Sequence, residues 1–351
     1  MVKAILAFLV IVLVFGAASF FLLTNKNTVT IATPQRKKST MFAVSPISQK
    51  NMNESPLTIE AMQNKSYPGS AITIEQTLSS NSYYYAYRVS YLSDGLKIYG
   101  LLAVPIGNKP QGGWPVILFN HGYIPPASYS TVSSYAVMFD PLASAGYIVF
   151  KPDYRGNGDS EGIAEQPYVS PSYITDSMNA LASIKKYKDA NPQKIGVFGH
   201  SMGGNITLHE LVVTHDIKAA ELMAGVVGSE ADLAAWWDQR FSTHSIIGND
   251  LDTYYAYEKM IEVNNTPAKN PSYWNSIDPA QDLSFITASI QIQVGSADED
   301  VPVTFSSSLY NLLLKNNKTV DYHEYQGADH NLAPDTASAM NETIAFFKKN
   351  L

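Results

Sequence analysis

One pentapeptide in this sequence can place a reactive hydroxyl group. Ser201 stands in Gly-His-Ser-Met-Gly at 199–203, which fits the Gly-x-Ser-x-Gly pattern of a nucleophile elbow. In such a turn the serine backbone is strained, and side chains two residues away on either side would clash, which explains a glycine at both positions. The apolar residues Ile195, Val197 and Phe198 ahead of the turn predict a buried strand, and a helical pattern follows. This setting predicts Ser201 as a nucleophile.

A serine hydroxyl needs a base, and the base must come from one of seven histidines. His330 lies in a loop after the last predicted strand, 320–325, and before the last predicted helix, which is where a base that follows the serine in sequence belongs. His323 lies within that strand, which favours a structural role. His200 stands inside the elbow and is expected to point away from the hydroxyl. We therefore predict His330 as the base.

The base works best when a carboxylate fixes its tautomer and stabilises its charge. Asp298 is the first acid after a strand predicted at 289–294, so it is expected at the end of the sheet, beside the position expected for the base. Glu299 and Asp300 in the same loop are alternatives, although a solvated loop charge or a residue at a helix start explains each more simply. We predict Asp298 as the acid.

The negative oxygen of a tetrahedral intermediate requires hydrogen-bond donors. The backbone N–H of Met202, next to the nucleophile, is one candidate. The backbone N–H of Tyr123, in the loop after a strand predicted at 116–119, is the other. Alternatively, Tyr123 lines the substrate pocket and another amide in the loop donates. We place three further side chains in that pocket: His121, Trp236 and Trp237.

The elements that must position these residues alternate between strand and helix. A predicted hairpin of strands 83–91 and 96–104, joined by a turn at 93–95, opens the domain. Short strand–helix repeats follow, with a helix expected at about 132–145. Such repeats predict parallel strands joined by crossover helices. We expect an α/β-hydrolase fold, with a mostly parallel central sheet and helices on both faces. The aromatic-rich segment 229–276 is too long for a simple connection. It is interpreted as a helical cap over the active site or, alternatively, as an insertion packed on the flank.

The first 23 residues differ from the rest of the chain. Residues 4–23 form an apolar run whose length, at 1.5 Å per helical residue, matches the roughly 30 Å hydrocarbon core of a bilayer. A single membrane anchor is the favoured interpretation, and a signal peptide cut near 16–18 is the alternative. Either one predicts an extracytoplasmic protein. Residues 24–56 have the composition of a flexible polar linker, and residues 57–351 are assigned to the catalytic domain.

Composition excludes several classes of function. The net charge of −7 argues against nucleic acid as a partner, and the absence of cysteine excludes a thiolate nucleophile and cysteine-bound metals. Histidines and acids show no metal-ligand spacing, so we expect no metal. The Gly-rich segment 153–160 lacks the spacing of a phosphate loop, so we expect no nucleotide cofactor and interpret it as a loop at the rim of the site.

Four motifs in one order resemble the catalytic domain of prolyl-oligopeptidase-like serine peptidases and their esterase relatives. They are Asp-Tyr-Arg-Gly at 153–156, Gly-His-Ser-Met-Gly-Gly at 199–204, Gly-x-x-Asp-x-x-Val-Pro at 295–302 and Gly-x-x-His at 327–330. The resemblance covers about 83–351 and implies a triad of Ser201, Asp298 and His330. The sequence departs from the family in two ways. It leaves no room for the β-propeller that precedes this domain in many family peptidases, and its oxyanion loop reads His-Gly-Tyr where His-Gly-Gly is common.

The expected activity is therefore cleavage of an acyl bond through an acyl-enzyme on Ser201. A peptidase related to prolyl oligopeptidase is the first candidate, with a small peptide as substrate. A carboxylesterase or acetyl esterase acting on small acyl esters is the alternative, because the family's propeller filters substrate size and is not expected here. A non-catalytic binding protein of the same fold is a remote third possibility.

Overall fold

The structure is a computed structural model that describes residues 55–243 and 249–351. The predicted anchor or signal peptide at 1–23 and nearly all of the predicted linker at 24–56 lie outside the described residues, so the extracytoplasmic location stays a prediction. Ser55 is already buried, and its carbonyl accepts a hydrogen bond from the Thr58 hydroxyl at 3.1 Å. The folded part thus includes residue 55, two residues before the predicted start at 57. Of the helices in the described ranges, none has the length and apolar character needed to cross a bilayer.

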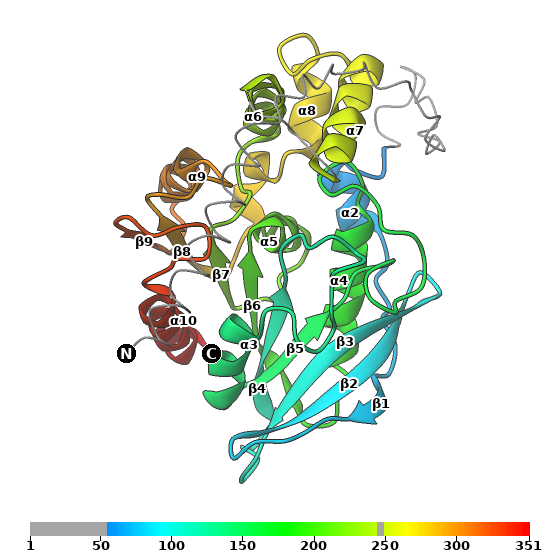
Figure 1. Ribbon diagram of the computed structural model, residues 1–351, viewed down its shortest axis with the longest axis vertical. Helices are drawn as coiled ribbons and strands as arrows, with labels where there is room; N and C mark the ends of the chain where they lie inside the picture. Colours follow the sequence, from blue (N-terminus) through cyan, green and yellow to red (C-terminus); the bar gives the residue numbers. More distant parts are fainter. Residues whose placement is uncertain (1–54, 244–248) are drawn as a thin grey trace, which may run out of the picture. The chain divides into compact units, whose positions relative to one another are not determined.

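A single nine-stranded sheet organises the described residues (Figure 1). Its spatial order is β1-β2-β3-β5-β4-β6-β7-β8-β9, with antiparallel pairing from β1 to β5 and parallel pairing from β5 to β9. The bounds are β1 Thr73–Thr77, β2 Tyr84–Ser93, β3 Leu96–Pro105, β4 Trp114–Asn120, β5 Ile148–Pro152, β6 Ala190–His200, β7 Ala219–Met223, β8 Ser289–Gly295 and β9 Val320–Tyr325. The predicted hairpin is β2–β3. Its turn residues Asp94 and Gly95 both have positive φ, which suits a tight hairpin turn.

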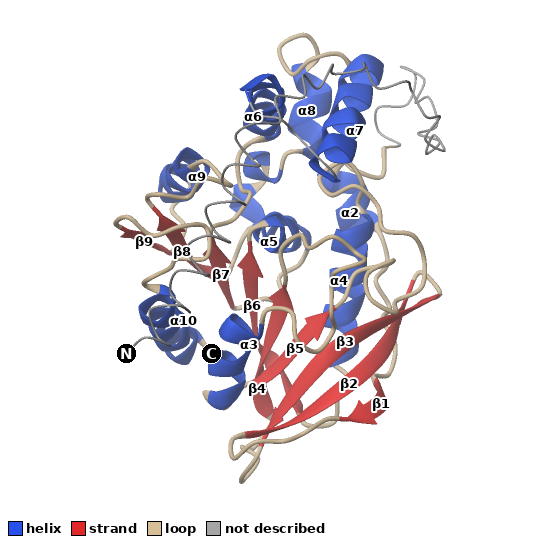
Figure 2. Cartoon of the chain, viewed as in Figure 1, coloured by secondary structure: helices blue, strands red, loops and turns tan. Residues whose placement is uncertain are grey.

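Helices cover both faces of the sheet (Figure 2). Alternation along β4 shows why: Val116 and Leu118 join the core beneath α4, α5 and α9, whereas Ile117 and Phe119 join the core beneath α3 and α10. The helix bounds are α2 Ile59–Asn64, α3 Ala136–Ser144, α4 Ser172–Ile184, α5 Met202–Val213, α6 Glu230–Thr243, α7 Asn249–Asn264, α8 Pro271–Ile277, α9 Val303–Lys315 and α10 Thr336–Asn350. The expected fold class is confirmed. The helix predicted at 132–145 begins only at Ala136, because Tyr135 has a left-handed backbone with φ 69°.

Three helices, α6 to α8, form the segment interpreted from the sequence as a cap. They follow the carboxyl end of β7 and lie together at the top of Figure 1. Tyr257 of α7 and Trp274 of α8 are fully buried and stack with ring centroids 6.3 Å apart. The segment therefore has an aromatic core of its own, and its action as a cap over substrate stays a prediction.

Glu230, the first residue of α6, should make the stability of the folded protein depend on pH. Its carboxyl group is buried and accepts a hydrogen bond from the Tyr257 hydroxyl at 2.7 Å. Burial, with a contribution from the nearby carboxylate of Asp278, raises the pKa of Glu230 from 4.5 to about 8. The folded protein thus holds a proton between these two pKa values that the unfolded chain releases. Stability must fall as the pH rises through that window and must stay low above it.

We expect Glu230→Gln to remove this loss of stability. Glutamine keeps an acceptor for Tyr257 but does not titrate. The melting temperature of the variant minus that of the wild type should therefore be larger at pH 9 than at pH 5. Glu262→Gln, at an exposed acid on α7, is the control and should show the same difference at both pH values. A Glu230→Gln difference that does not depend on pH would contradict the prediction.

Candidate active site

The turn at Ser201 has the strained geometry that the sequence pattern predicts. Ser201 lies between the last residue of β6 and the first residue of α5, with φ 56° and ψ −121°. A Cβ atom at Gly203 would lie 2.0 Å from the Asn120 carbonyl oxygen, and one at Gly199 would lie 2.4 Å from the Gly203 carbonyl oxygen. Both positions therefore require glycine for steric reasons.

Neighbouring backbone holds this turn in place. The Ser201 N–H donates to the carbonyl of Met223 at the end of β7, at 3.1 Å, and the Ser201 carbonyl accepts from the N–H of Val226 at 3.0 Å. Met202 is the first residue of α5, so its N–H has no acceptor within the helix. The partly positive end of the helix thus lies directly beside the Ser201 side chain.

The structure brings together the three residues predicted as a triad. His330 Nε2 lies 2.9 Å from Ser201 Oγ, and His330 Nδ1 lies 2.8 Å from Asp298 Oδ2. The Asp298 side chain is fully buried, whereas 13% of the His330 side chain is exposed. A serine whose hydroxyl meets one nitrogen of an imidazole, with a buried carboxylate on the other, has the arrangement needed for nucleophilic catalysis.

Adjacent strands explain how distant residues meet. Asp298 follows β8 and His330 follows β9, and these parallel strands are neighbours. Their loops are so close that a Cβ atom at Gly295 would lie 2.3 Å from the Ala328 carbonyl oxygen. Asp329 makes the turn, since its Oδ1 accepts the N–H groups of Asn331 and Ala333, each at 2.9 Å.

The acid is held in one orientation by its own loop. Asp298 Oδ1 accepts the backbone N–H groups of Asp300 and Val301, each at 2.9 Å, which leaves Oδ2 for His330. A carboxylate can only accept, so His330 carries its proton on Nδ1 and presents an unprotonated Nε2 to Ser201. This is the tautomer that can remove the serine proton.

The loop after β4 passes beside the nucleophile. A Cβ atom at Gly122 would lie 2.9 Å from Ser201 Cβ, so only glycine allows this approach. Tyr123 follows directly and is half-buried. Met202 and Tyr123 thus belong to two segments that meet at Ser201, and the role of their backbone N–H groups as oxyanion donors stays a prediction.

His121 differs from its predicted place in a substrate pocket. Its side chain is 1% exposed, and its ring lies against the rings of Tyr129 and Tyr154, with centroids 4.5 and 4.3 Å away. Its Nδ1 lies 2.8 Å from the Gly122 carbonyl oxygen. Burial, together with the charge of Lys151, lowers the pKa of His121 to about 3. The ring is thus a neutral support beneath the loop, which aromatic packing decides and sequence spacing could not reveal.

The two predicted pocket tryptophans belong to α6. The ring of Trp236 meets the ring of Phe305 on α9 at 5.7 Å, and the guanidinium of Arg240 lies 5.6 Å from the same indole. Trp237 is buried beside Tyr168. These contacts join α6 to α9 and to the loop before α4, and the role of the tryptophans in binding substrate stays a prediction.

The segment interpreted as a rim loop, 153–160, contacts the loop after β4, and its place at the rim of a substrate site stays a prediction. Asp153 accepts the Tyr129 hydroxyl at 2.7 Å, and the Tyr154 hydroxyl donates to the His121 carbonyl at 3.1 Å. Arg155 forms a salt bridge with the buried Asp176 of α4 at 2.7 Å. The segment therefore connects the loop beside Ser201 to a helix on one face of the sheet.

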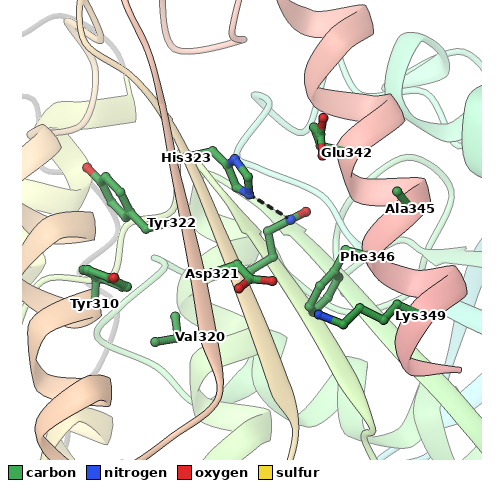
Figure 3. A pocket seen from close by; sticks show the side chains of 10 residues that line it. Tyr310, Val320, Asp321, Tyr322, His323, Glu342, Ala345, Phe346 and Lys349 are labelled. Carbon is green, nitrogen blue, oxygen red and sulfur yellow. Dashed lines mark hydrogen bonds between the residues drawn. The ribbon is translucent and has the colours of Figure 1, made fainter.

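A groove of about 460 Å³ lies at the far edge of the sheet, between β9 and α10 (Figure 3). His323 faces it and makes a hydrogen bond to Gln291 at 3.3 Å, as expected for a structural histidine. The triad residues do not line this groove. Within 55–243 and 249–351, no three histidine or acidic side chains are grouped so that they could hold a metal ion.

Comparison with solved structures defines the class of protein. The chain superposes on an acetyl xylan esterase from Paenibacillus sp. R4 with a TM-score of 0.61 and 18% identity, over 87% of this chain and all of that one. It superposes on dipeptidyl peptidase 4 from Porphyromonas gingivalis with a TM-score of 0.59 and 22% identity, over 77% of this chain but 36% of that one. These similarities identify an α/β-hydrolase fold.

The family follows from the sequence comparison. The profile described as the prolyl oligopeptidase family matches residues 133–351, and the chain belongs to that family. A curated relative, the uncharacterized peptidase YtmA of Bacillus subtilis, is 24% identical over 272 residues, which cover 75% of this chain and 93% of that protein. The family resemblance stated from the four motifs is confirmed.

Proposed function

We propose that this protein is a serine hydrolase that cleaves an acyl bond through a covalent intermediate on Ser201. The observation that carries the proposal is the hydrogen-bonded series from Ser201 Oγ through His330 to Asp298, with donor–acceptor distances of 2.9 and 2.8 Å. Membership of the prolyl oligopeptidase family supports it.

The series allows a balanced reaction. Ser201 Oγ bonds to the substrate carbonyl carbon while its proton passes to His330 Nε2, and the carbonyl oxygen becomes an oxyanion beside the Met202 and Tyr123 N–H groups. The intermediate then collapses: the bond to the leaving group breaks, and that group takes the proton from Nε2. Water repeats the steps, giving its proton to Nε2 and releasing the acid and free Ser201.

A peptide is the first candidate substrate. The relative YtmA, which this chain matches over 93% of its length, carries the name of a peptidase. A small acyl ester is the second candidate, and one observation favours it: all strands in the described ranges belong to one sheet, so no propeller stands over the site there. The chain also superposes on the acetyl xylan esterase over the whole length of that esterase.

A fluorophosphonate probe tests the proposal, because it reacts only with an activated serine. We expect the full chain to be labelled and Ser201→Ala not to be labelled. Ser308→Ala, at an exposed serine on α9, is the control and should label like the wild type. Wild-type protein that takes up no probe would overturn the proposal and would favour a non-catalytic binding protein.

A substrate panel then separates the two candidates. Acetyl and butyryl p-nitrophenyl esters are compared with aminoacyl and prolyl p-nitroanilides at matched concentrations. Turnover of an anilide that is lost in Ser201→Ala supports the peptidase. Turnover confined to the esters supports the esterase.

A further inference from the structure

Two side chains outside the triad connect opposite sides of the site. The N–H of Gly122 donates to the Tyr135 hydroxyl at 2.8 Å, the same hydroxyl lies 3.1 Å from His200 Nδ1, and His200 Nε2 lies 3.1 Å from the His330 carbonyl oxygen. We propose that Tyr135 and His200 are positioning residues, which hold the oxyanion loop and the backbone of the base in register across Ser201. This inference rests on the proposed hydrolase function.

The donors and acceptors along these contacts allow the hydrogen bonds only one direction. The Tyr135 oxygen already accepts from the Gly122 amide, and its single proton can then go only to an acceptor. The His330 carbonyl is also an acceptor, so His200 Nε2 must carry the hydrogen of a neutral ring. The series therefore runs from the Gly122 N–H through the Tyr135 O–H to His200 Nδ1, and from His200 Nε2–H to the His330 carbonyl.

The surroundings keep both groups in these protonation states. His200 is 2% exposed, and its ring centroid lies 4.9 Å from that of His330. Burial, with a contribution from the charge of His330, lowers the pKa of His200 to about 3. Burial also raises the pKa of the Tyr135 hydroxyl above its ordinary value. A protonated His200 would place a second positive charge beside the His330 imidazolium that forms during turnover.

The local backbone is built to bring the Tyr135 hydroxyl to Gly122. Tyr135 adopts a left-handed conformation with φ 69°, which is uncommon for a residue with a large side chain. Its ring packs edge-on against Phe119 with centroids 5.7 Å apart. A Cβ atom at Gly122 would lie 2.3 Å from the Tyr135 hydroxyl oxygen, so the hydroxyl occupies space that any other residue would fill.

The series would affect catalysis through the positions of the oxyanion donor and the base relative to Ser201. Gly122 precedes Tyr123, whose N–H is a predicted oxyanion donor, and the anchored carbonyl belongs to the base itself. Loss of the series should let the donor and the base move relative to Ser201. Displacements of about 1 Å can cost about 100-fold in rate.

Kinetics of four variants and one control variant test the inference with p-nitrophenyl acetate and with the fluorophosphonate probe. We expect Tyr135→Phe and His200→Leu each to lower kcat by about 10- to 100-fold with little change in KM. The double variant should be little worse than either single one, because both interrupt one series. His200→Gln should recover most of the loss, since its amide can accept from Tyr135 and donate to His330. Tyr147→Phe, at a buried tyrosine that packs on Phe347, is the control and should not differ from the wild type.

Two kinetic outcomes would overturn the inference. One is wild-type kcat in Tyr135→Phe, which removes a single oxygen and leaves the packing on Phe119. The other is a double variant whose loss is the product of two independent losses, with no recovery in His200→Gln.

The histidine tautomer provides a readout that does not depend on activity. In ¹⁵N-histidine-labelled full-length protein, the signal that disappears in His200→Gln should show hydrogen on Nε2 and should not titrate between pH 5 and 9. Hydrogen on Nδ1, or titration in that range, would overturn the inference. Wild-type protein that neither reacts with the probe nor turns over an ester would instead overturn the hydrolase proposal, and the NMR result would still decide whether the series exists.

Discussion

Replacing His330 with alanine should lower kcat/KM for a p-nitrophenyl ester by about 10⁴- to 10⁶-fold. In the proposed reaction its Nε2, 2.9 Å from Ser201 Oγ, accepts the serine proton, and without it the hydroxyl would stay protonated at neutral pH. The side chain is partly exposed and lies in a loop, so the fold should survive. The measurements are steady-state rates and a thermal melt followed by circular dichroism.

A second histidine serves as the matched control for this variant. His323 lies on β9, seven residues before His330, and is bonded to Gln291 in the groove of Figure 3. His323→Ala should keep wild-type turnover. Retained turnover in His330→Ala, with the fold intact, would remove His330 from the catalytic machinery.

Replacing Asp298 with asparagine should lower kcat by about 10⁴-fold, through the tautomer of the base. The N–H groups of Asp300 and Val301 already donate to Asp298 Oδ1. An asparagine must keep its oxygen there, so its NH₂ group would face His330 Nδ1. That nitrogen would then become the acceptor, and Nε2 would carry a hydrogen toward Ser201 Oγ, where it cannot accept one.

The same loop provides the controls for the acid. Glu299→Gln and Asp300→Asn remove the alternative acids considered from the sequence while leaving Asp298 in place. Both should keep turnover within a few-fold of wild type. A loss in either variant that equals the loss in Asp298→Asn, at unchanged melting temperature, would contradict the assignment of the acid.

Local patterns were sufficient for the fold and for the motif residues. Alternation in 83–104, the Asp94-Gly95 turn and the short strand–helix repeats depend on nearest neighbours, and the structure confirms the fold class that they predict. The elbow can also be predicted from the sequence, because the steric requirement for Gly199 and Gly203 is local.

Other features could not be predicted because they depend on contacts between distant segments. His121 has a motif position that suggests a pocket, yet its ring is held by Tyr129 and Tyr154 from two other segments. Tyr135 shows no sequence signal for its left-handed backbone, which also shortens the predicted helix. The motif places His200 next to Ser201, but its hydrogen-bond partners come from two separate loops, which the sequence does not indicate.

Strand–helix periodicity and turn chemistry are properties of adjacent residues, so the fold class, the family and the candidate serine, acid and histidine can be predicted from the sequence alone. The hydrogen-bond distances between these three side chains, and the contacts of Tyr135 and His200 that connect the two sides of the site, appear only in the tertiary structure. Those facts depend on which strands are neighbours and how closely their loops approach. Such distances arise from packing across the sheet, and no stretch of sequence contains them.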